Sequence, residues 1–125
     1  MKLPRLDVVA WVAIFLFAVL SWRIVESFRM SLQLAFADEQ TEVFSVMVEK
    51  ALAAVRRDPP DVKSAVGCLG YVHRYYPSGT KQSHGSDLDR IVERSRKAAE
   101  RQIMDAVRAA TDVDYGAKVD DWIRE

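Results

Sequence analysis

An all-α fold is predicted for this chain by three features of its sequence. Helix-breaking residues are scarce, with 5 glycines and 4 prolines among 125 residues. None of them lies between Arg5 and Arg57, so that stretch contains no strong helix breaker. Beyond it, apolar residues recur at spacings of three and four, which is the period of an amphipathic helix. We expect an N-terminal transmembrane or signal-anchor helix, followed by a small three-helix bundle with a short docked C-terminal helix.

Residues 1–23 are predicted to form a membrane anchor. The run from Val8 to Trp22 has no charged residue, and the wider stretch from Leu6 to Val25 offers the roughly 20 positions that a spanning helix needs. A signal peptide cleaved after Ser21 and a buried helix of a soluble core are the alternatives. Length and flanking residues favour an uncleaved anchor, with the lipid bilayer as its partner.

The charges beside this segment give a prediction of its orientation. Lys2, Arg5 and the terminal amine precede the span, whereas Arg23 and Arg29 follow it. Basic residues are enriched on the cytoplasmic side of membrane proteins. The slight excess at the N-terminus therefore places the rest of this single-pass chain on the extracytoplasmic side.

Residues 24–37 are predicted to form an amphipathic juxtamembrane helix. Its apolar stripe falls on one helical face and comprises Ile24, Val25, Phe28, Leu32, Ala35 and Phe36. Such a stripe fits a helix lying in the membrane interface. It also fits a helix that packs on its own domain, which is the interpretation we favour because few basic residues accompany the stripe.

Residues 38–125 are predicted to form the small helical domain. A helix with Phe44, Met47, Val48, Ala51 and Val55 on one face ends at Asp58-Pro59-Pro60, because proline cannot continue it. A second helix is expected at about 61–76, where Gly67 and Gly70 permit close packing of a neighbour. A third is expected at about 86–110, with Ser86 as its N-cap. Its expected inner face is Leu88, Val92, Ser95, Ala99, Ile103, Ala106 and Ala110. A turn at residues 112–116 is expected to lead to a short amphipathic tail that docks on the bundle through Val119, Trp122 and Ile123.

Charge and motifs exclude several classes of function. With 18 basic and 18 acidic residues, and 14 basic against 16 acidic from Asp38 onward, the chain lacks the basic excess of a nucleic-acid binder. A single cysteine, Cys68, excludes an internal disulfide. The residue patterns of a phosphate loop and of a calcium loop are incomplete, at residues 79–81 and 112–123 respectively. Cys68 and His73 are five apart and so do not share a helical face. We expect no cofactor and no metal.

Two groups of residues are candidates for a functional site. Tyr71, Arg74, Tyr75, Tyr76 and Lys81 form an aromatic and basic cluster of the kind found on contact surfaces. The same cluster is typical of an ordinary helix end that packs against a loop. The loop at 77–87 carries His84, Ser86 and Asp87, which are the residue types of a hydrolase triad. Sequence neighbours rarely form a triad, because its members come from separate elements.

The segment 75–82, YYPSGTKQ, followed by LDRIVER at 88–94, resembles segments of short uncharacterised bacterial proteins with one N-terminal hydrophobic span. The ending Asp114-Tyr115-Gly116, with Trp122 after it, is similar to theirs. The resemblance implies a membrane-associated helical protein and brings no catalytic residues.

The sequence thus favours a membrane-tethered, non-enzymatic interaction or accessory protein with a protein partner. Two alternatives stay open. One is a small membrane-bound hydrolase or ligand binder that uses the loop at 77–87. The other is a homo-oligomer that assembles through the N-terminal helix.

Overall fold

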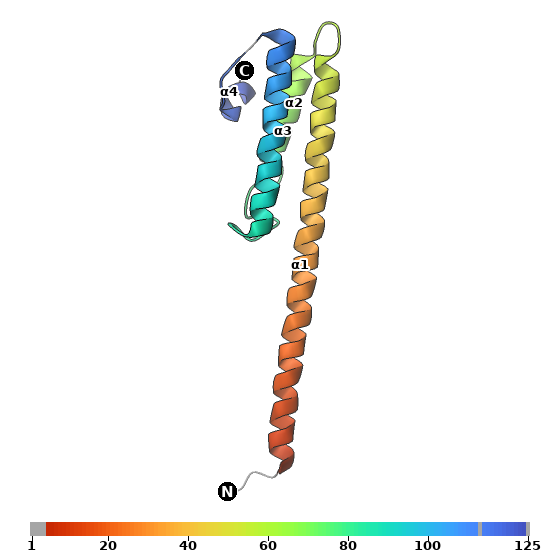
Figure 1. The fold of residues 1–125 in the computed structure, drawn as a ribbon, viewed down its shortest axis with the longest axis vertical. Helices are drawn as coiled ribbons and strands as arrows, with labels where there is room; N and C mark the ends of the chain where they lie inside the picture. Colours follow the sequence, from red (N-terminus) through yellow and green to blue (C-terminus); the bar gives the residue numbers. More distant parts are fainter. Residues whose placement is uncertain (1–4, 113, 125) are drawn as a thin grey trace. The chain divides into compact units, whose positions relative to one another are not determined.

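The computed structural model describes residues 5–112 and 114–124, and the all-α prediction is confirmed (Figure 1). Within these residues the chain forms four helices and no strand: α1 (Arg5–Val55), α2 (Val62–Arg74), α3 (Asp87–Thr111) and α4 (Val119–Ile123). The chain divides into two compact units, one up to Leu34 and one from Ala35 onward. Helix α1 belongs to both, and its residues 35–55 are part of the second unit.

In the first unit, α1 carries a stretch that is long and apolar enough to cross a membrane, and none of its most apolar window is buried. A signal sequence near the N-terminus meets the same criteria of length and composition, and so does the core helix of a soluble protein. A core helix, however, would be mostly buried. The side chains of Phe15, Phe17 and Leu20 are instead exposed by 59 to 72%.

The predicted juxtamembrane segment divides at the same boundary. Ile24, Phe28 and Leu32 are exposed side chains of the first unit. Ala37 lies in the second unit and is buried, as one of the first core residues of that unit. Of the stripe residues, only Phe36 at the C-terminal end is half-buried, and Ala37 beside it is buried.

The core of the second unit is made by the facing sides of its helices. From α1, Phe44, Val48, Ala51 and Ala54 are buried; from α2, Ala65, Leu69 and Val72; from α3, Val92, Ala99, Ile103, Met104 and Val107; from α4, Val119 and Trp122. Helix α2 starts at Asp61, whose carboxylate accepts hydrogen bonds from the Ser64 amide (3.0 Å) and hydroxyl (2.6 Å). These bonds lower the pKa of Asp61, which is typical of a charged N-cap.

Helix α3 begins as predicted, but its inner face differs from the prediction. Ser86 is the N-cap and its hydroxyl accepts a hydrogen bond from the Asp89 amide at 3.2 Å. Ser95 and Ala106 are only partly buried and Ala110 is exposed. The charged residues Asp89, Arg96 and Glu100 are buried in their place. These three point inward because each of them has polar partners in another part of the unit, as described below.

The two glycines of α2 play different roles. A side chain on Gly70 would meet the Cδ1 and Cγ1 atoms of Ile123 at 3.9 Å, so Gly70 lies where α4 approaches α2, as predicted. A side chain on Gly67 would meet no atom within 4 Å, and this glycine is exposed. The expectation of close helix packing is therefore wrong for Gly67, which faces an open space.

A candidate partner-binding groove

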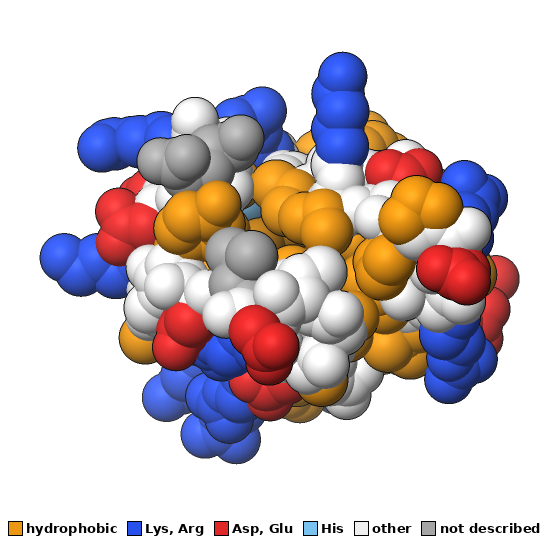
Figure 2. All heavy atoms as spheres, turned by 90° about the horizontal axis from the view of Figure 1, so that it is seen from above, with side chains coloured by type: hydrophobic (Ala, Val, Ile, Leu, Met, Phe, Trp, Pro, Cys, Tyr) orange, Lys and Arg blue, Asp and Glu red, His pale blue; other side chains and the backbone are white. Residues whose placement is uncertain are grey.

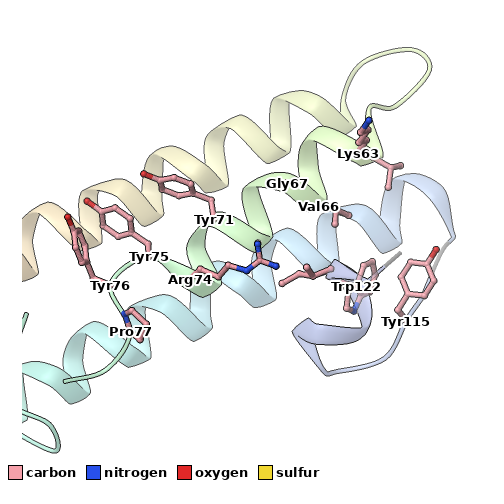
Figure 3. Close-up of a pocket in the computed structure, with 13 residues that line it drawn as sticks. Lys63, Val66, Gly67, Tyr71, Arg74, Tyr75, Tyr76, Pro77, Tyr115 and Trp122 are labelled. Atoms are coloured by element: carbon pink, nitrogen blue, oxygen red, sulfur yellow. The ribbon is translucent and has the colours of Figure 1, made fainter. Parts of the chain in front are cut away.

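That open space is a groove of about 1070 Å³ in the second unit. It runs along the outer face of α2 and is closed on one side by the α3–α4 connection and α4 (Figure 3). Its lining residues are mostly apolar or aromatic: Val62, Lys63, Val66, Gly67, Gly70, Tyr71, Arg74, Tyr75, Tyr76, Pro77, Tyr115, Trp122 and Ile123. Ligand and peptide sites usually combine such a concave apolar lining with a few polar groups.

Three tyrosines form the first wall. The rings of Tyr71 and Tyr75 are stacked, with centroids 5.3 Å apart, and Tyr76 meets Tyr75 edge to face at 4.6 Å. Tyr75 is anchored inward by an edge contact with Phe44 of α1 at 6.3 Å, and burial raises the pKa of its hydroxyl. Tyr71 and Tyr76 remain 49% and 41% exposed. The wall therefore offers rigid aromatic surface to the groove.

The second wall depends on Trp122, which is completely buried. Its indole Nε1 donates a hydrogen bond to the Gly116 carbonyl at 2.9 Å, and its ring meets Tyr115 edge to face at 5.1 Å. The Arg108 guanidinium lies over the same ring at 5.2 Å and donates hydrogen bonds to Asp114 (2.9 Å) and to the Gly116 carbonyl. Arg108 thus fixes the α3–α4 turn and, with it, the position of this wall.

Polar side chains hold the turn at Tyr76, at one end of the first wall, from the inside of the second unit. The backbone of Tyr76 has a positive φ of 40°, which is unfavourable for a residue with a bulky side chain. Its carbonyl accepts hydrogen bonds from Arg96 Nη2 at 2.7 Å and from Gln40 Nε2 at 3.2 Å. Gln82 Nε2 donates in turn to Gln40 Oε1 at 2.8 Å. These buried contacts compensate the unusual conformation and fix the turn that presents Tyr76.

Arg96 also stabilises the C-terminus of α2. Its Nη1 atom donates to the carbonyls of His73 (3.1 Å) and Val72 (3.4 Å), which belong to the last helical turn. Carbonyls in a last turn have no partner within the helix, and a positive charge there is favourable for the helix dipole. The guanidinium also lies 5.2 Å from the Phe44 ring centroid. Arg96 is therefore buried because α2 supplies its partners.

The structure brings four of the five predicted surface residues to this groove. Tyr71, Arg74, Tyr75 and Tyr76 line it, whereas Lys81 is not among the lining residues. The Lys81 ammonium lies over the rings of Phe36 and Tyr76, at 4.5 and 4.6 Å from their centroids. It therefore supports the outside of the tyrosine wall by cation–π contacts.

The other candidate residues, in the loop at 77–87, are held apart by separate contacts. Ser86 caps α3, and Asp87 pairs with Arg90. His84 Nδ1 lies 3.2 Å from the hydroxyl of Ser78, a residue that the sequence analysis did not single out. Ser78 and His84 meet because both belong to the tight loop that precedes α3.

The loop is closed around the buried carboxylate of Asp89. Ser78 Oγ donates to Asp89 Oδ2 at 2.6 Å, and the amides of Gly79 and Gly85 donate at 3.1 and 3.2 Å. Burial alone raises the pKa of Asp89, but these three bonds lower it further than burial raises it. In a nucleophilic triad the imidazole stands between hydroxyl and carboxylate. Here the Ser78 hydroxyl stands between His84 and Asp89, an arrangement that closes a loop.

His73 connects α2 to both neighbouring helices. Its Nδ1 atom lies 3.1 Å from Glu100 Oε1 of α3, and its Nε2 atom lies 3.6 Å from Asp120 Oδ1 of α4. This explains why Glu100 is buried. Among the described residues, no group of His, Cys, Asp and Glu side chains is arranged to hold a metal ion.

No protein-family model, curated protein or solved structure matches this chain. The groove and the apolar segment of α1 are therefore the features of this chain that bear on its function.

Proposed function

We propose that this chain is a membrane-tethered, non-enzymatic interaction protein that holds a protein partner in the groove along α2. The apolar stretch of α1 is the tether, and it crosses the bilayer once. The second unit lies on the extracytoplasmic side, because Lys2, Arg5 and the terminal amine precede the span.

The composition of the groove is the observation that carries this proposal. Tyrosine, tryptophan and arginine are the residues that dominate binding energy in protein interfaces. The groove combines four tyrosines with Arg74, and the buried Trp122 supports its second wall from inside. The tyrosine wall and the Trp122 wall are both fixed by contacts inside the second unit, so little side-chain freedom is lost when a partner binds.

Gly67 makes the proposal testable without disturbing the fold. Its position is exposed and a Cβ there meets nothing within 4 Å, so a larger side chain extends into the groove and not into the core. Glycine costs a helix interior about 1 kcal/mol relative to alanine, and phenylalanine costs less, up to about 0.7 kcal/mol, so the replacement loses no helix propensity. Gly67→Phe is therefore expected to fill the groove in a protein at least as stable as the wild type.

The test is cross-linking purification of the tagged full-length protein from solubilised membranes, followed by mass spectrometry. We expect a partner that is recovered with the wild type and lost with Gly67→Phe and with Tyr71→Ala. Ile91→Ala is the matched control, because Ile91 is an exposed apolar residue of α3 outside the groove. His84→Ala is the control for chemistry in the loop, and it should also retain the partner.

Three results would overturn the proposal. Recovery of the same partners with Gly67→Phe as with wild type would show that the groove does not bind them. A phenotype abolished by His84→Ala, with partner recovery unchanged, would favour a hydrolase or ligand binder that uses the loop. Recovery of a second copy of the chain alone would favour self-assembly through the N-terminal helix, if removal of residues 1–37 then abolished it.

A further inference from the structure

The charges of the groove restrict what kind of partner fits it. Two lining residues are charged, Lys63 and Arg74, and both are basic. Among the described residues that line the groove, none is an aspartate or a glutamate. The chain from Asp38 onward is slightly acidic, with 14 basic and 16 acidic residues, so the two basic lining residues are opposite in sign to its net charge. In Figure 2, apolar side chains of the second unit lie between charged side chains at the edges of the view.

The spacing of the two cations gives a length. Lys63 and Arg74 lie eleven positions apart on α2, which corresponds to about three turns, or about 16 Å at 1.5 Å per residue. Eleven positions also return to nearly the same face of a helix, so both cations border the same groove. Figure 3 shows Lys63 towards one end, Tyr76 and Pro77 at the other, and Arg74 between them.

The shape of the groove indicates a helical occupant. Its floor is a helix, α2, and Gly67 removes a side chain from the middle of that floor. Two helices pack most closely where a small residue allows one to enter the groove of the other. Helix-in-groove recognition uses apolar residues of the partner at helical spacing, here facing the exposed rings of Tyr71 and Tyr115.

From these observations we propose that the groove binds an amphipathic α-helix of about three turns, with an apolar face and an acidic residue near each end. The two carboxylates of the partner lie about eleven residues apart and pair with Lys63 and Arg74. This inference rests on the proposed function, since it specifies the partner segment that the groove holds.

The experiment uses the full-length protein in nanodiscs of zwitterionic lipid and two fluorescein-labelled designed helical peptides. Both peptides carry leucines at helical spacing, and two positions eleven apart are glutamate in one and lysine in the other. Binding is measured by fluorescence anisotropy. Two partly exposed ion pairs, against two repulsive contacts, lead us to expect about tenfold tighter binding of the glutamate peptide at low salt. This preference should shrink as salt screens the charges.

Charge reversal supplies the specificity test. The double variant Lys63→Glu, Arg74→Glu should reverse the preference, so that the lysine peptide binds more tightly. The matched control is Arg94→Glu, Arg101→Glu, which reverses two exposed cations of α3 that do not line the groove. It should leave the preference unchanged. Gly67→Phe should abolish the binding of both peptides.

Several outcomes would overturn this inference and leave the proposed function intact. Equal binding of the two peptides would show that the partner helix needs no acidic residue near its ends. A preference unaffected by charge reversal at Lys63 and Arg74 would show the same. If neither peptide binds while Gly67→Phe still abolishes partner capture, the occupant of the groove is not an amphipathic helix of this kind. A lipid that co-purifies with wild type but not with Gly67→Phe would identify the occupant as an acyl chain, and that outcome would overturn the proposed protein partner as well. Partner capture that is insensitive to Gly67→Phe would instead overturn the proposed function.

Discussion

A single buried carboxylate organises the loop before α3. Asp89 is only 3% exposed, and it accepts three hydrogen bonds from Ser78, Gly79 and Gly85 while its own amide is capped by Ser86. Bonds to a charged acceptor are stronger than neutral ones. Asp89 also connects the loop to the α2 C-terminus, because Ser78 follows directly after the Tyr76 turn. The position of the tyrosine wall thus depends partly on this carboxylate.

We expect Asp89→Asn to lower the free energy of unfolding at neutral pH by about 1 to 3 kcal/mol, because an amide cannot accept all three bonds. The pKa of Asp89 is lower in the folded protein than its ordinary value of about 3.9. Its stabilisation is therefore present above that pH and is lost as the pH falls through the folded-state value. The difference between wild type and variant should shrink accordingly.

Denaturant titrations followed by circular dichroism, between about pH 7 and pH 3, measure this difference. Asp87→Asn is the control, since that carboxylate is exposed and pairs with Arg90 within the first turn of α3. It should change stability little. A difference between wild type and Asp89→Asn that stayed constant down to pH 3 would contradict the role given to the Asp89 charge.

At the scale of elements, α4 shows how five residues can be held in place. Its docking depends on Trp122, whose ring contacts Tyr115 and Arg108 and whose Nε1 donates to Gly116. We expect Trp122→Ala to leave a cavity and cost about 3 to 5 kcal/mol. The loss should be local, because α2 and α3 share other core residues such as Leu69 and Ile103.

Hydrogen exchange measured by mass spectrometry should show this locality. With Trp122→Ala, exchange should become faster over residues 114–124, while the middle of α3 keeps its protection. Tyr115→Ala is the matched variant, because Tyr115 lines the groove but is 37% exposed. It should alter exchange little. Faster exchange throughout α3 would show that α4 is part of the cooperative core instead.

The elements were predictable from sequence to different degrees. Proline and glycine mark where helices end, and the N-cap Ser86 marks where α3 begins. These boundaries can be predicted because each residue acts on the backbone next to it in the sequence. The inner face of α3 was not predictable in full, because a charged residue is normally assigned to solvent. Arg96 can be buried because it donates to carbonyls at the end of α2, and Glu100 can be buried because it contacts His73. In both cases the partner lies more than 20 positions away in the sequence.

The candidate site divides in the same way. The cluster at Tyr71 to Tyr76 is visible in sequence because its members are close neighbours along the chain, at the C-terminal end of α2. The second wall at Tyr115 and Trp122 lies about 40 to 50 positions further along the chain, and no periodicity connects it to α2. The open space at Gly67 had no local signal in the sequence either. Gly70, also a glycine of α2, lies instead where Ile123 approaches closely.

At the scale of the whole molecule, membrane attachment is the property on which the proposed function depends. The apolar stretch of α1 is left exposed by the residues that the structure describes. Burying such a surface in lipid is strongly favourable. We expect the full-length protein to remain in the membrane pellet after extraction at alkaline pH. Deletion of residues 1–37 should release the remainder. An intact mass that lacks the first 21 residues would show a cleaved signal peptide and contradict the tether.

Orientation is tested on the same preparation with a membrane-impermeant maleimide. Cys68 is replaced by alanine, and single cysteines are placed at Leu3 or at Ala98, which is exposed on α3. The extracytoplasmic prediction requires that the Ala98→Cys variant is labelled in intact cells whose inner membrane is sealed. The Leu3→Cys variant should be labelled only after that membrane is permeabilised. The opposite pattern would place the groove in the cytoplasm, because the two positions flank the proposed span and would report on opposite sides of it.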